Sequence, residues 1–523
     1  MRCLSHQAVV AAVVALLLAV NLTATAQTTP SARKLPSAEK IVDNYLKAIG
    51  GKKTAAAIRD ATYEYSIQVN DQPFGTARAQ TKLPASERWE MTFGNGQVIS
   101  ATNSGSAWER GIDGQLRTLT GPEAATAKLH GILSASRLVN TKKSNVLARV
   151  ISIADPASDP AYTIEFSTRG GARLQYYFST KTGLLTKVID DVRKNRTSFE
   201  DYRREKGILE PHKIRVSLGS GDLLLLLKSV SYDQDLAKSL FDPPAAAETV
   251  DVIGLLREVA RNQDVLEKRV SEYAFRQKET DRQITDKGVI KKETVKVYEV
   301  YPIPNREPVL KLISENGVEL SGERATREEK RVLEELEKAE RDREKDEREA
   351  ERKKAQQAKK NEAEQEDPEI SQFLRACEFV SPRREKFNGR EAIVFDFRPR
   401  PGFRPTNRSE SLIAKLVGVV WIDPVDKQVM RLEARLSDGF KIGGGLVLSL
   451  RPGAALAMEQ TRMIEGVWLP RYAQVNLSIK ILLFGGGDLN KTIEWSDYRH
   501  FSGDVKDYKL DSPKSEAETK KPE

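Results

Sequence analysis

The chain has 523 residues, of which 39% are hydrophobic and 30% charged, and this suits a soluble protein with room for about three average domains or two large β-rich ones. The formal net charge of +9 is modest for this length, and basic residues are spread among acidic ones, so the charge argues against a nucleic-acid-binding surface. It leaves open a weak attraction to anionic membrane surfaces.

Residues 1–26 have the features of a secretory signal peptide. Arg2 gives a positive start, residues 9–20 form an apolar run, and Ala24-Thr25-Ala26 has the small-x-small form of a cleavage site. The run is too short to span a bilayer comfortably, so we expect cleavage and a periplasmic protein, with an uncleaved anchor as the alternative. Cleavage leaves Cys377 as the one cysteine. We expect it to be a half-buried apolar residue, with an intermolecular disulfide as the alternative.

After a linker (27–36), the first half is predicted to consist mostly of strands, with two helices. Ser37 is a plausible N-cap for a helix over 38–49, which Gly50-Gly51 ends. Strands follow, separated by turn signals such as Asn95-Gly96, and residues 122–138 read as a second helix. The leucine run 223–227 predicts a strand covered on both faces. The predicted strands before the second helix are 63–69, 77–82, 88–93, 97–101 and 107–110.

Residues 241–247, with two prolines and three alanines, mark a boundary. The second half again opens with an amphipathic helix, 252–270, and passes into strands. Residues 323–367 are dense in Glu, Lys and Arg, and the i,i+4 spacing of opposite charges predicts a projecting helix or helical hairpin. The apolar heptad of a coiled coil stops at Leu336. The tail, 504–523, is polar and is expected to be disordered.

A pattern in the first half returns in the second. Residues 177–188 and 199–216 are predicted to form a strand, a polar turn, a second strand, a third strand that ends in Gly-x-x-x-Pro, and a fourth strand. Residues 420–432 and 458–475 repeat this order of elements. A period of this length indicates two related domains rather than a solenoid. We therefore expect an α+β protein with two tandem curved antiparallel sheets, over 37–245 and 251–503. Each is expected to be an incomplete β-barrel with a helix across its open side, and the charged insertion lies in the second.

No motif of an enzyme is present. The sequence has no His-Glu-x-x-His, no Gly-x-Ser-x-Gly, no phosphate-binding Gly-x-x-x-x-Gly-Lys and no Cys-x-x-Cys. The histidines of the mature chain, His130, His212 and His500, are far apart. We expect no catalysis, cofactor or metal, with an unrecognised hydrolase as a minor alternative. The glycine clusters 443–445 and 485–487 are expected to mark bends at strand ends.

The concave face of a curved sheet is either filled by its own side chains or open to an apolar ligand, and the sequence leaves both possibilities. Transfer of an acyl chain of about 16 carbons into a dry cavity is favourable by on the order of 10 kcal/mol. Strand alternation selects the candidate lining residues, for each of which core packing is the alternative role. They are Tyr63, Tyr65, Ile67, Trp89, Met91 and Phe93, and in the second half Trp421, Ile422, Leu446, Val447 and Trp468.

The layout resembles the LolA-like fold, a group that includes periplasmic carriers of outer-membrane lipoproteins and the LolB and RseB relatives. The resemblance is carried by the tryptophan-containing hairpins of 89–108, the strands of 177–188 and 199–216, and Phe241-Asp242-Pro243-Pro244. It implies an incomplete β-barrel closed by helices around a hydrophobic cavity that holds acyl chains. The tandem and the charged insertion depart from the carrier, and no contact residue of the carrier is transferred.

These observations predict an exported, non-catalytic envelope protein that binds a lipid or the acyl part of a lipoprotein. The alternative is an interaction or sensor scaffold of the cell envelope that binds another protein through residues 323–367. No nucleic acid is expected as a partner. The oligomeric state, and whether the two halves share one site, stay open.

Overall fold

The computed structural model describes residues 35–154, 159–218, 221–246, 250–270, 272–285, 287–303, 307–354, 368–442, 448–463, 466–481, 485–501 and 510–511. The predicted signal peptide and most of the linker and tail therefore lie outside the described residues, as do 355–367 of the charged insertion and the candidates Leu446 and Val447. The chain divides into two compact units, 1–36 and 37–523, and both sheets belong to the second unit.

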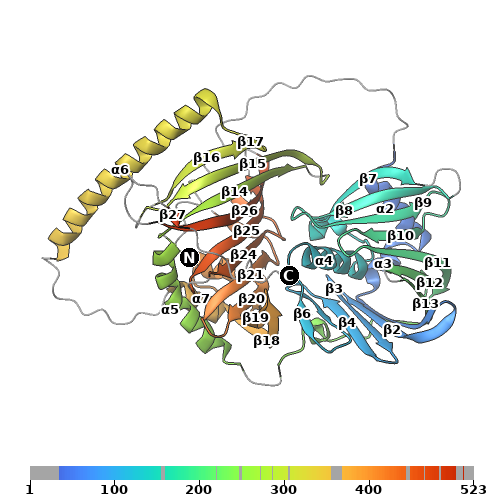
Figure 1. Ribbon diagram of the computed structural model, residues 1–523. Coiled ribbons are helices and arrows are strands. Elements are labelled where there is room, and N and C mark those ends of the chain that lie inside the picture. Colours follow the sequence, from blue (N-terminus) through green and yellow to red (C-terminus); the bar gives the residue numbers. More distant parts are fainter. Residues whose placement is uncertain are drawn as a thin grey trace. The chain divides into compact units, whose positions relative to one another are not determined.

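The first sheet has 13 strands in the order β6-β5-β4-β3-β2-β1-β13-β12-β11-β10-β9-β8-β7, and neighbouring strands are antiparallel (Figure 1). In such a sheet the chain reverses direction at each turn, so every second turn along the chain lies at the same end of the sheet. The strands are β1 Asp60–Val69, β2 Gln72–Lys82, β3 Ser86–Phe93, β4 Gly96–Thr102, β5 Ala107–Arg110, β6 Leu116–Thr118, β7 Leu147–Ala154, β8 Ala161–Ser167, β9 Arg173–Ser179, β10 Leu185–Asp190, β11 Asn195–Glu205, β12 Ile208–Leu218 and β13 Gly221–Tyr232.

Two predicted helices pack on this sheet. In α2, Ala38–Ala48, the Ser37 hydroxyl accepts a hydrogen bond from the Lys40 amide at 3.2 Å, as expected of an N-cap. The other, α4, spans Gly121–Ala135 and ends three residues before the predicted boundary. Leu129 and Leu133 of α4 join Ile41 of α2 in one core cluster with strands β8 to β10. Helix α4 also contacts β2 to β5. It therefore touches strands on both sides of the central β1–β13 pair. A short helix, α3, Lys52–Ala57, and the 3-10 turns η3, Thr141–Ser144, and η4, Lys238–Phe241, complete this half.

The second sheet has 14 strands, of which 11 form the path β17-β16-β15-β14-β26-β25-β24-β21-β20-β19-β18. The strands β22, β23 and β27 lie off this path. The bounds are β14 Tyr273–Ile284, β15 Ile290–Tyr301, β16 Val309–Glu315, β17 Val318–Glu319, β18 Cys377–Phe387, β19 Arg390–Pro399, β20 Leu416–Asp423, β21 Gln428–Leu436, β22 Phe440–Ile442, β23 Leu448–Leu450, β24 Ala455–Arg462, β25 Trp468–Ile481, β26 Gly485–Phe501 and β27 Leu510–Asp511.

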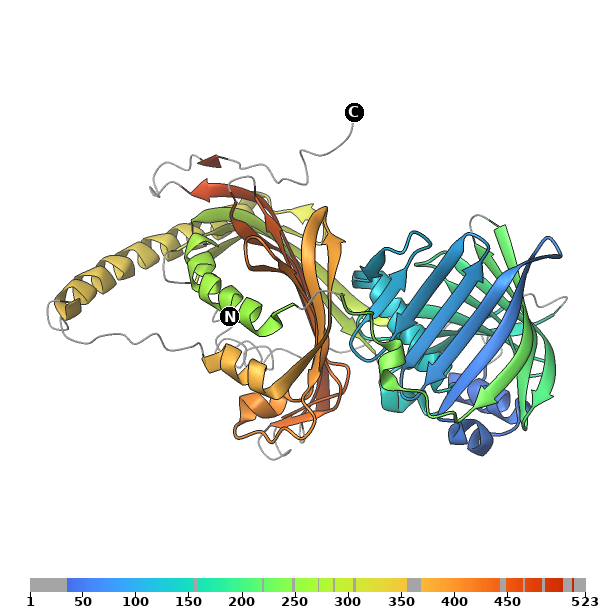
Figure 2. The ribbon, with the colours of Figure 1, turned by 90° about the horizontal axis from the view of Figure 1, so that it is seen from below.

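Helices α5, Val252–Val270, and α7, Pro368–Ala376, cover one face of β19 to β21 (Figure 2). Leu256 and Val259 of α5 pack there against Phe395 and Ile422. The short helix α8, Arg408–Ile413, joins β19 to β20. Cys377 is fully buried rather than half-buried, and burial raises the pKa of its thiol to about 12. The charged insertion begins as α6, Gly322–Lys354, in which Glu337 and Arg341, at the i,i+4 spacing, form an ion pair at 3.6 Å.

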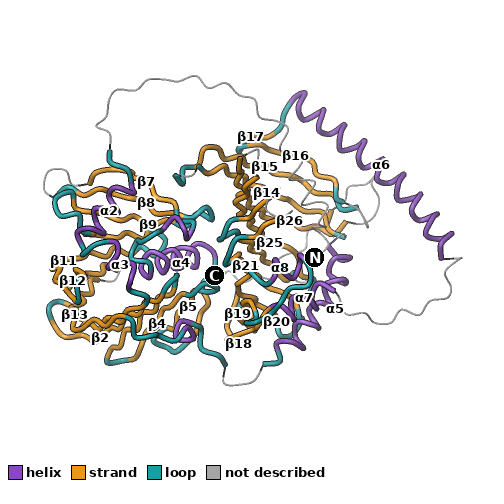
Figure 3. Tube along the Cα trace, turned by 180° about the vertical axis from the view of Figure 1, so that it is seen from behind, coloured by secondary structure: helices purple, strands orange, loops and turns teal. Residues whose placement is uncertain are grey.

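The two sheets follow the same strand order. Starting from β7 and from β18, each path takes seven strands in chain order and then returns to the strand that follows the leading helix, β1 after α2 and α3 or β14 after α5. The two copies of the repeated sequence pattern become β9 to β12 and β20, β21, β24 and β25, which are consecutive neighbours in both sheets. The prediction of tandem, mostly antiparallel sheets is confirmed (Figure 3). Neither path closes into a barrel among the described strands, since each ends on two edge strands.

Candidate functional site

The floor of the candidate site is a row of small residues on β2. Gly75, Ala77 and Ala79 pair on one side with Ile67, Tyr65 and Tyr63 of β1, and on the other with Phe93, Met91 and Trp89 of β3. Residues that pair across antiparallel strands point to the same face. The six large residues predicted in the first half therefore stand in two rows on one face, with the small residues between them.

We call the inward-facing side chains of this region the apolar trough. They form one cluster, to which α4 contributes no residue. The Tyr65 and Trp89 rings stack across the alanine row at 5.9 Å between centroids, and this ring pair covers the floor. The members of the trough are Tyr63, Tyr65, Ile67, Ala77, Ala79, Trp89, Met91, Phe93, Phe199, Ile214, Val216, Leu223, Leu225 and Leu227.

Burial along β12 and β13 decreases toward the β1–β2 turn, whereas along β1 Ile67, near this turn, is buried. Along β12, Ile214 is buried, Val216 is half-buried and Leu218 is exposed. Along β13, Leu225 is buried while Leu223 is half-buried. Trp89, Met91 and Phe93 also keep part of their surface exposed. The partly exposed side chains of the trough are thus the row on β3 and those at the ends of β12 and β13 near the β1–β2 turn.

A polar cluster closes the inner end of the trough. Glu210 accepts hydrogen bonds from the hydroxyls of Tyr63 at 3.1 Å and Tyr232 at 2.6 Å, and Arg137 pairs with it at 2.8 Å. Burial raises the pKa of both tyrosines, so both hydroxyls stay protonated and can donate. The Oε1 atom of Glu210 is thus bound to three donors. Glu210 therefore has a structural role, because these bonds hold the segment after α4 against β1, β12 and β13.

A second polar cluster fixes α4 to β3 beside the trough. The buried Glu87 carboxylate contacts His130 Nδ1 at 2.6 Å, and accepts hydrogen bonds from Ser134 at 2.9 Å and Trp89 at 3.1 Å. Ser134 and His130 both bind the carboxylate, so Ser134 is not activated by His130 and the group has no nucleophile-base pair. Burial alone lowers the pKa of His130, but the Glu87 carboxylate raises it above its usual value.

The second-half candidates lie in a different environment. Trp421 is 1% exposed, Ile422 0% and Trp468 3%. Trp421 and Trp468 share one cluster, whereas Ile422 belongs to the cluster under α5, on the opposite face of the sheet. The structure therefore brings the six first-half candidates together and divides the described second-half candidates between two closed faces. Whether any of them lines a ligand site stays a prediction.

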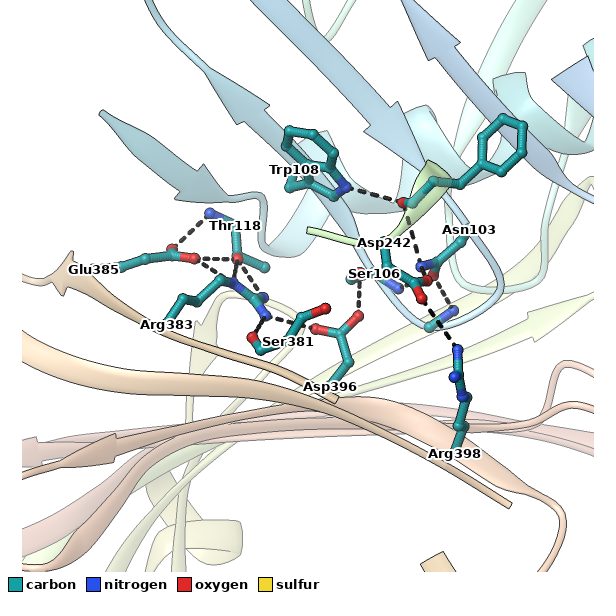
Figure 4. Close-up of polar contacts among 12 residues, drawn as sticks. Asn103, Ser106, Trp108, Thr118, Asp242, Ser381, Arg383, Glu385, Asp396 and Arg398 are labelled. Atoms are coloured by element: carbon teal, nitrogen blue, oxygen red, sulfur yellow. Dashed lines mark hydrogen bonds and ion pairs between the residues drawn. The ribbon is translucent and has the colours of Figure 1, made fainter. Parts of the chain in front are cut away.

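Sequence reasoning did not find the polar junction between the two sheets. Arg383 of β18 is 1% exposed and pairs with Glu385 at 2.7 Å and with Asp396 at 3.0 Å (Figure 4). Thr118 of β6 donates to Glu385 through its amide at 2.6 Å and its hydroxyl at 2.5 Å, and Ser106 donates to Asp396 at 2.5 Å. Three charged groups are thus desolvated together, and hydroxyl and amide donors of the first half add hydrogen bonds to the two carboxylates.

The segment that joins the two halves is fixed at the same place. The Trp108 indole donates to the Phe241 carbonyl at 3.0 Å, and Asp242 accepts from Asn103 at 2.8 Å (Figure 4). Arg398 of β19 reaches Asp242 from the other side at 3.2 Å. Only one signal in the sequence points to this junction, namely Asp396, which interrupts the apolar run of 392–397.

A cleft of about 470 Å³ lies beside the junction. It lies outside the apolar trough, and its lining combines edge-strand residues of both sheets with the joining segment. The lining residues are Arg110, Gly114, Leu116, Pro244, Ala245, Ala246, Arg383 and Arg384.

Within the described ranges, no group of three or more His, Cys, Asp or Glu side chains is placed to hold a metal ion. Among the helices described, none has both the length and the apolar character needed to cross a membrane.

A scan of protein families finds none that matches this chain, and no curated protein matches it. Among solved structures, a LolA superfamily protein from Nitrosomonas europaea is similar at 12% identity and a TM-score of 0.28, over 40% of this chain and 98% of its own. A DUF1329 family protein from Desulfovibrio piger gives 12% identity and 0.27, over 39% and 97%. The MucA/MucB complex of Pseudomonas aeruginosa gives 8% identity and 0.17, over 88% and 99%. The LolA-like resemblance is thus found again among solved structures, but TM-scores this low carry no argument about function, partners or site residues.

Proposed function

We propose that this protein is an exported, non-catalytic envelope protein that binds one acyl chain of a lipid or lipoprotein in the apolar trough, with α4 across the open side of the first sheet. The observation that carries the proposal is the partly exposed row of large apolar side chains on β3. Trp89, Met91 and Phe93 stand in this row beside a line of small residues on β2, and no residue of α4 belongs to their cluster.

The chemistry follows from this arrangement. Each methylene that leaves water for an apolar surface contributes about 0.8 kcal/mol when fully buried. Because the rings of Tyr65 and Trp89 stack over the alanine row, the acyl chain lies along the rings rather than beneath them. The polar cluster of Tyr63, Glu210 and Arg137 limits the length of chain that the trough accepts.

Quenching of Trp89 fluorescence tests this proposal. A fatty acid brominated on its acyl chain is titrated into the full chain, and we expect it to quench the fluorescence of Trp89, which is partly exposed in the trough. The Trp89→Phe variant should lose most of the quenching, whereas Trp495→Phe, at a half-exposed tryptophan of the second sheet, should retain it. Absence of quenching, or quenching that is equal in the two variants, would reject the acyl site.

A second candidate function is a scaffold that binds another envelope protein through α6. The observation in its favour is the length of this helix, 33 residues, of which Val332 and Leu336 pack in a small cluster with Tyr301 and Val309. Deletion of 323–367 separates the two functions. Loss of a co-purifying protein with intact fatty-acid quenching would favour the scaffold.

A further inference from the structure

One end of the first sheet carries a set of exposed apolar side chains. Because neighbouring strands are antiparallel, the turns β1–β2, β3–β4, β5–β6, β8–β9, β10–β11 and β12–β13 all lie at the same end. Four of the exposed large apolar residues lie at or beside these turns. We call them the apolar rim: Phe74 at 50% exposure, Ile112 at 46%, Val192 at 40% and Leu218 at 36%.

Each rim residue comes from a different turn. Phe74 follows the β1–β2 turn, Ile112 lies between β5 and β6, Val192 between β10 and β11, and Leu218 is the last residue of β12. Single exposed apolar residues are common on proteins and carry no meaning alone. Here the apolar trough reaches the same end, since Phe93 of the trough contacts Phe74 of the rim at 5.3 Å between ring centroids.

The second half lies against part of this end. Arg169 of the β8–β9 turn pairs with Asp488, and its carbonyl accepts a hydrogen bond from Asn490. Asn145, before β7, donates to the Pro452 carbonyl at 3.1 Å, and Gly114 of the β5–β6 turn lines the junction cleft with Arg384. The turns β1–β2, β10–β11 and β12–β13, which carry the other three rim residues, are distinct from these turns.

Cationic groups lie at the same end. The cleft beside the junction is lined by Gly114 of the β5–β6 turn, together with Arg110 and Arg384. Arg110 donates to Gln97 Oε1 at 3.2 Å. Apolar tips next to guanidinium groups suit a surface that presents both acyl chains and phosphates.

We propose that the rim end of the first sheet docks on a phospholipid bilayer, so that Phe74, Ile112, Val192 and Leu218 enter the interface while Arg110 faces headgroup phosphate. This inference rests on the proposed function and deepens it, because docking places the end of the trough that adjoins the rim at the surface from which an acyl chain is taken or to which it is delivered. No covalent step is involved.

Flotation of the full chain with vesicles of phosphatidylethanolamine and phosphatidylglycerol tests the rim. We expect the unaltered protein to float and the double variant Phe74→Ser, Leu218→Ser to lose vesicle partitioning by about tenfold or more. The matched control is Ile153→Ser, which removes a side chain of 39% exposure from β7 near the opposite end of the sheet. Equal flotation of the double variant and the control, or no flotation of the unaltered protein, would overturn the inference.

The same variants separate this inference from the proposed function. The double variant should still bind the dissolved brominated fatty acid, because its substitutions lie outside the trough cluster. If the unaltered protein does not float but its fluorescence is still quenched, the docking inference is overturned and the acyl site stands. If the fluorescence is not quenched but flotation depends on Phe74 and Leu218, the acyl site is overturned and the docking inference stands.

Vesicle composition tests the assignment of the headgroup. Arg110→Gln should weaken binding to vesicles that contain phosphatidylglycerol and leave binding to pure phosphatidylcholine vesicles unchanged, since it removes a cation and no rim side chain. Equal binding of this variant and the unaltered protein to both kinds of vesicle would overturn the role given to Arg110.

Discussion

Two regions of the sheets, β19 to β21 and β1 to β3, differ in how their large apolar side chains are covered. In the second sheet, α5 and α7 cover one face of β19 to β21, and every residue of β20 after Leu416 is buried. On the other face, Asp396, Glu433 and Arg435 meet residues of the first half. The counterparts of these strands in the first sheet, β8 to β10, are likewise buried under α2 and α4, whereas the row of Trp89, Met91 and Phe93 on β3 keeps part of its surface exposed. The strands β19 to β21 thus form a closed core and a junction, and the row on β3 leaves apolar surface accessible.

The largest contrast is expected from the same substitution in both regions. Trp421→Ala in the closed region should lower the free energy of unfolding by about 3–5 kcal/mol, because it leaves a cavity among fully buried neighbours. Trp89→Ala in the trough should cost only about 1–2 kcal/mol, because this side chain already contacts solvent. Chemical denaturation measures the free energy of unfolding of both variants. Equal losses would contradict the difference in burial between the two regions.

Breaking the junction should have a similar or slightly smaller effect. Arg383→Met leaves Glu385 and Asp396 buried without their cation, which costs about 3–5 kcal/mol. The matched control is Arg384→Met at the next, exposed position, where we expect a change of about 0.5 kcal/mol or less. Thermal unfolding of the two variants distinguishes a buried junction from a solvated one, for which both changes would be small.

Filling the trough floor should act on binding more than on stability. Ala77→Phe adds a ring beneath Tyr65 and Trp89, which should cost about 1–3 kcal/mol in overpacking and, by displacing the two rings along which the acyl chain lies, abolish quenching by the brominated fatty acid. Thr76→Phe places the same ring on the outer face of β2, where Thr76 is exposed, and should leave quenching unchanged. If Ala77→Phe folds and still binds, the acyl chain does not occupy the trough.

The smallest effect is the pH dependence of the contact between α4 and β3. His130 has a raised pKa in the folded state, so its contribution is complete at low pH and is lost as the pH rises through that value. Although burial acts to raise it, the pKa of Glu87 is lowered by His130, Ser134 and Trp89, so its contribution is lost as the pH falls. The side chain of His130 is 39% exposed, so we expect less than about 1 kcal/mol in total. In His130→Gln, the free energy of unfolding should vary less with pH between about 5 and 9.

The strands that line the trough could be predicted because their pattern is local. The alternation of Tyr63, Tyr65 and Ile67 and the turn at Asn95-Gly96 determine strands and a hairpin from neighbouring residues. The leucine run of β13 is also a strand, but Leu224 and Leu226 are only half-buried, so the expectation of full cover on both faces holds only in part. The start of α4 was predicted to within one residue, but its end was not, because Arg137 and Leu138 adopt left-handed conformations as the chain turns toward the Glu210 cluster.

Most strands, the longer helices, the alternation of side chains and the repeat in the second half could be read from the residues alone, since these depend on residues close together in the chain or on direct comparison of two stretches. That Trp421 and Ile422 lie on opposite, closed faces while Trp89 stays half-exposed follows only from the packing of distant segments. The same packing joins Thr118 to Glu385, which is 267 residues away. Whether a sheet face is covered, and whether a charged group is desolvated, depends on the side chains that pack against it. Those side chains come from segments that are distant in the sequence.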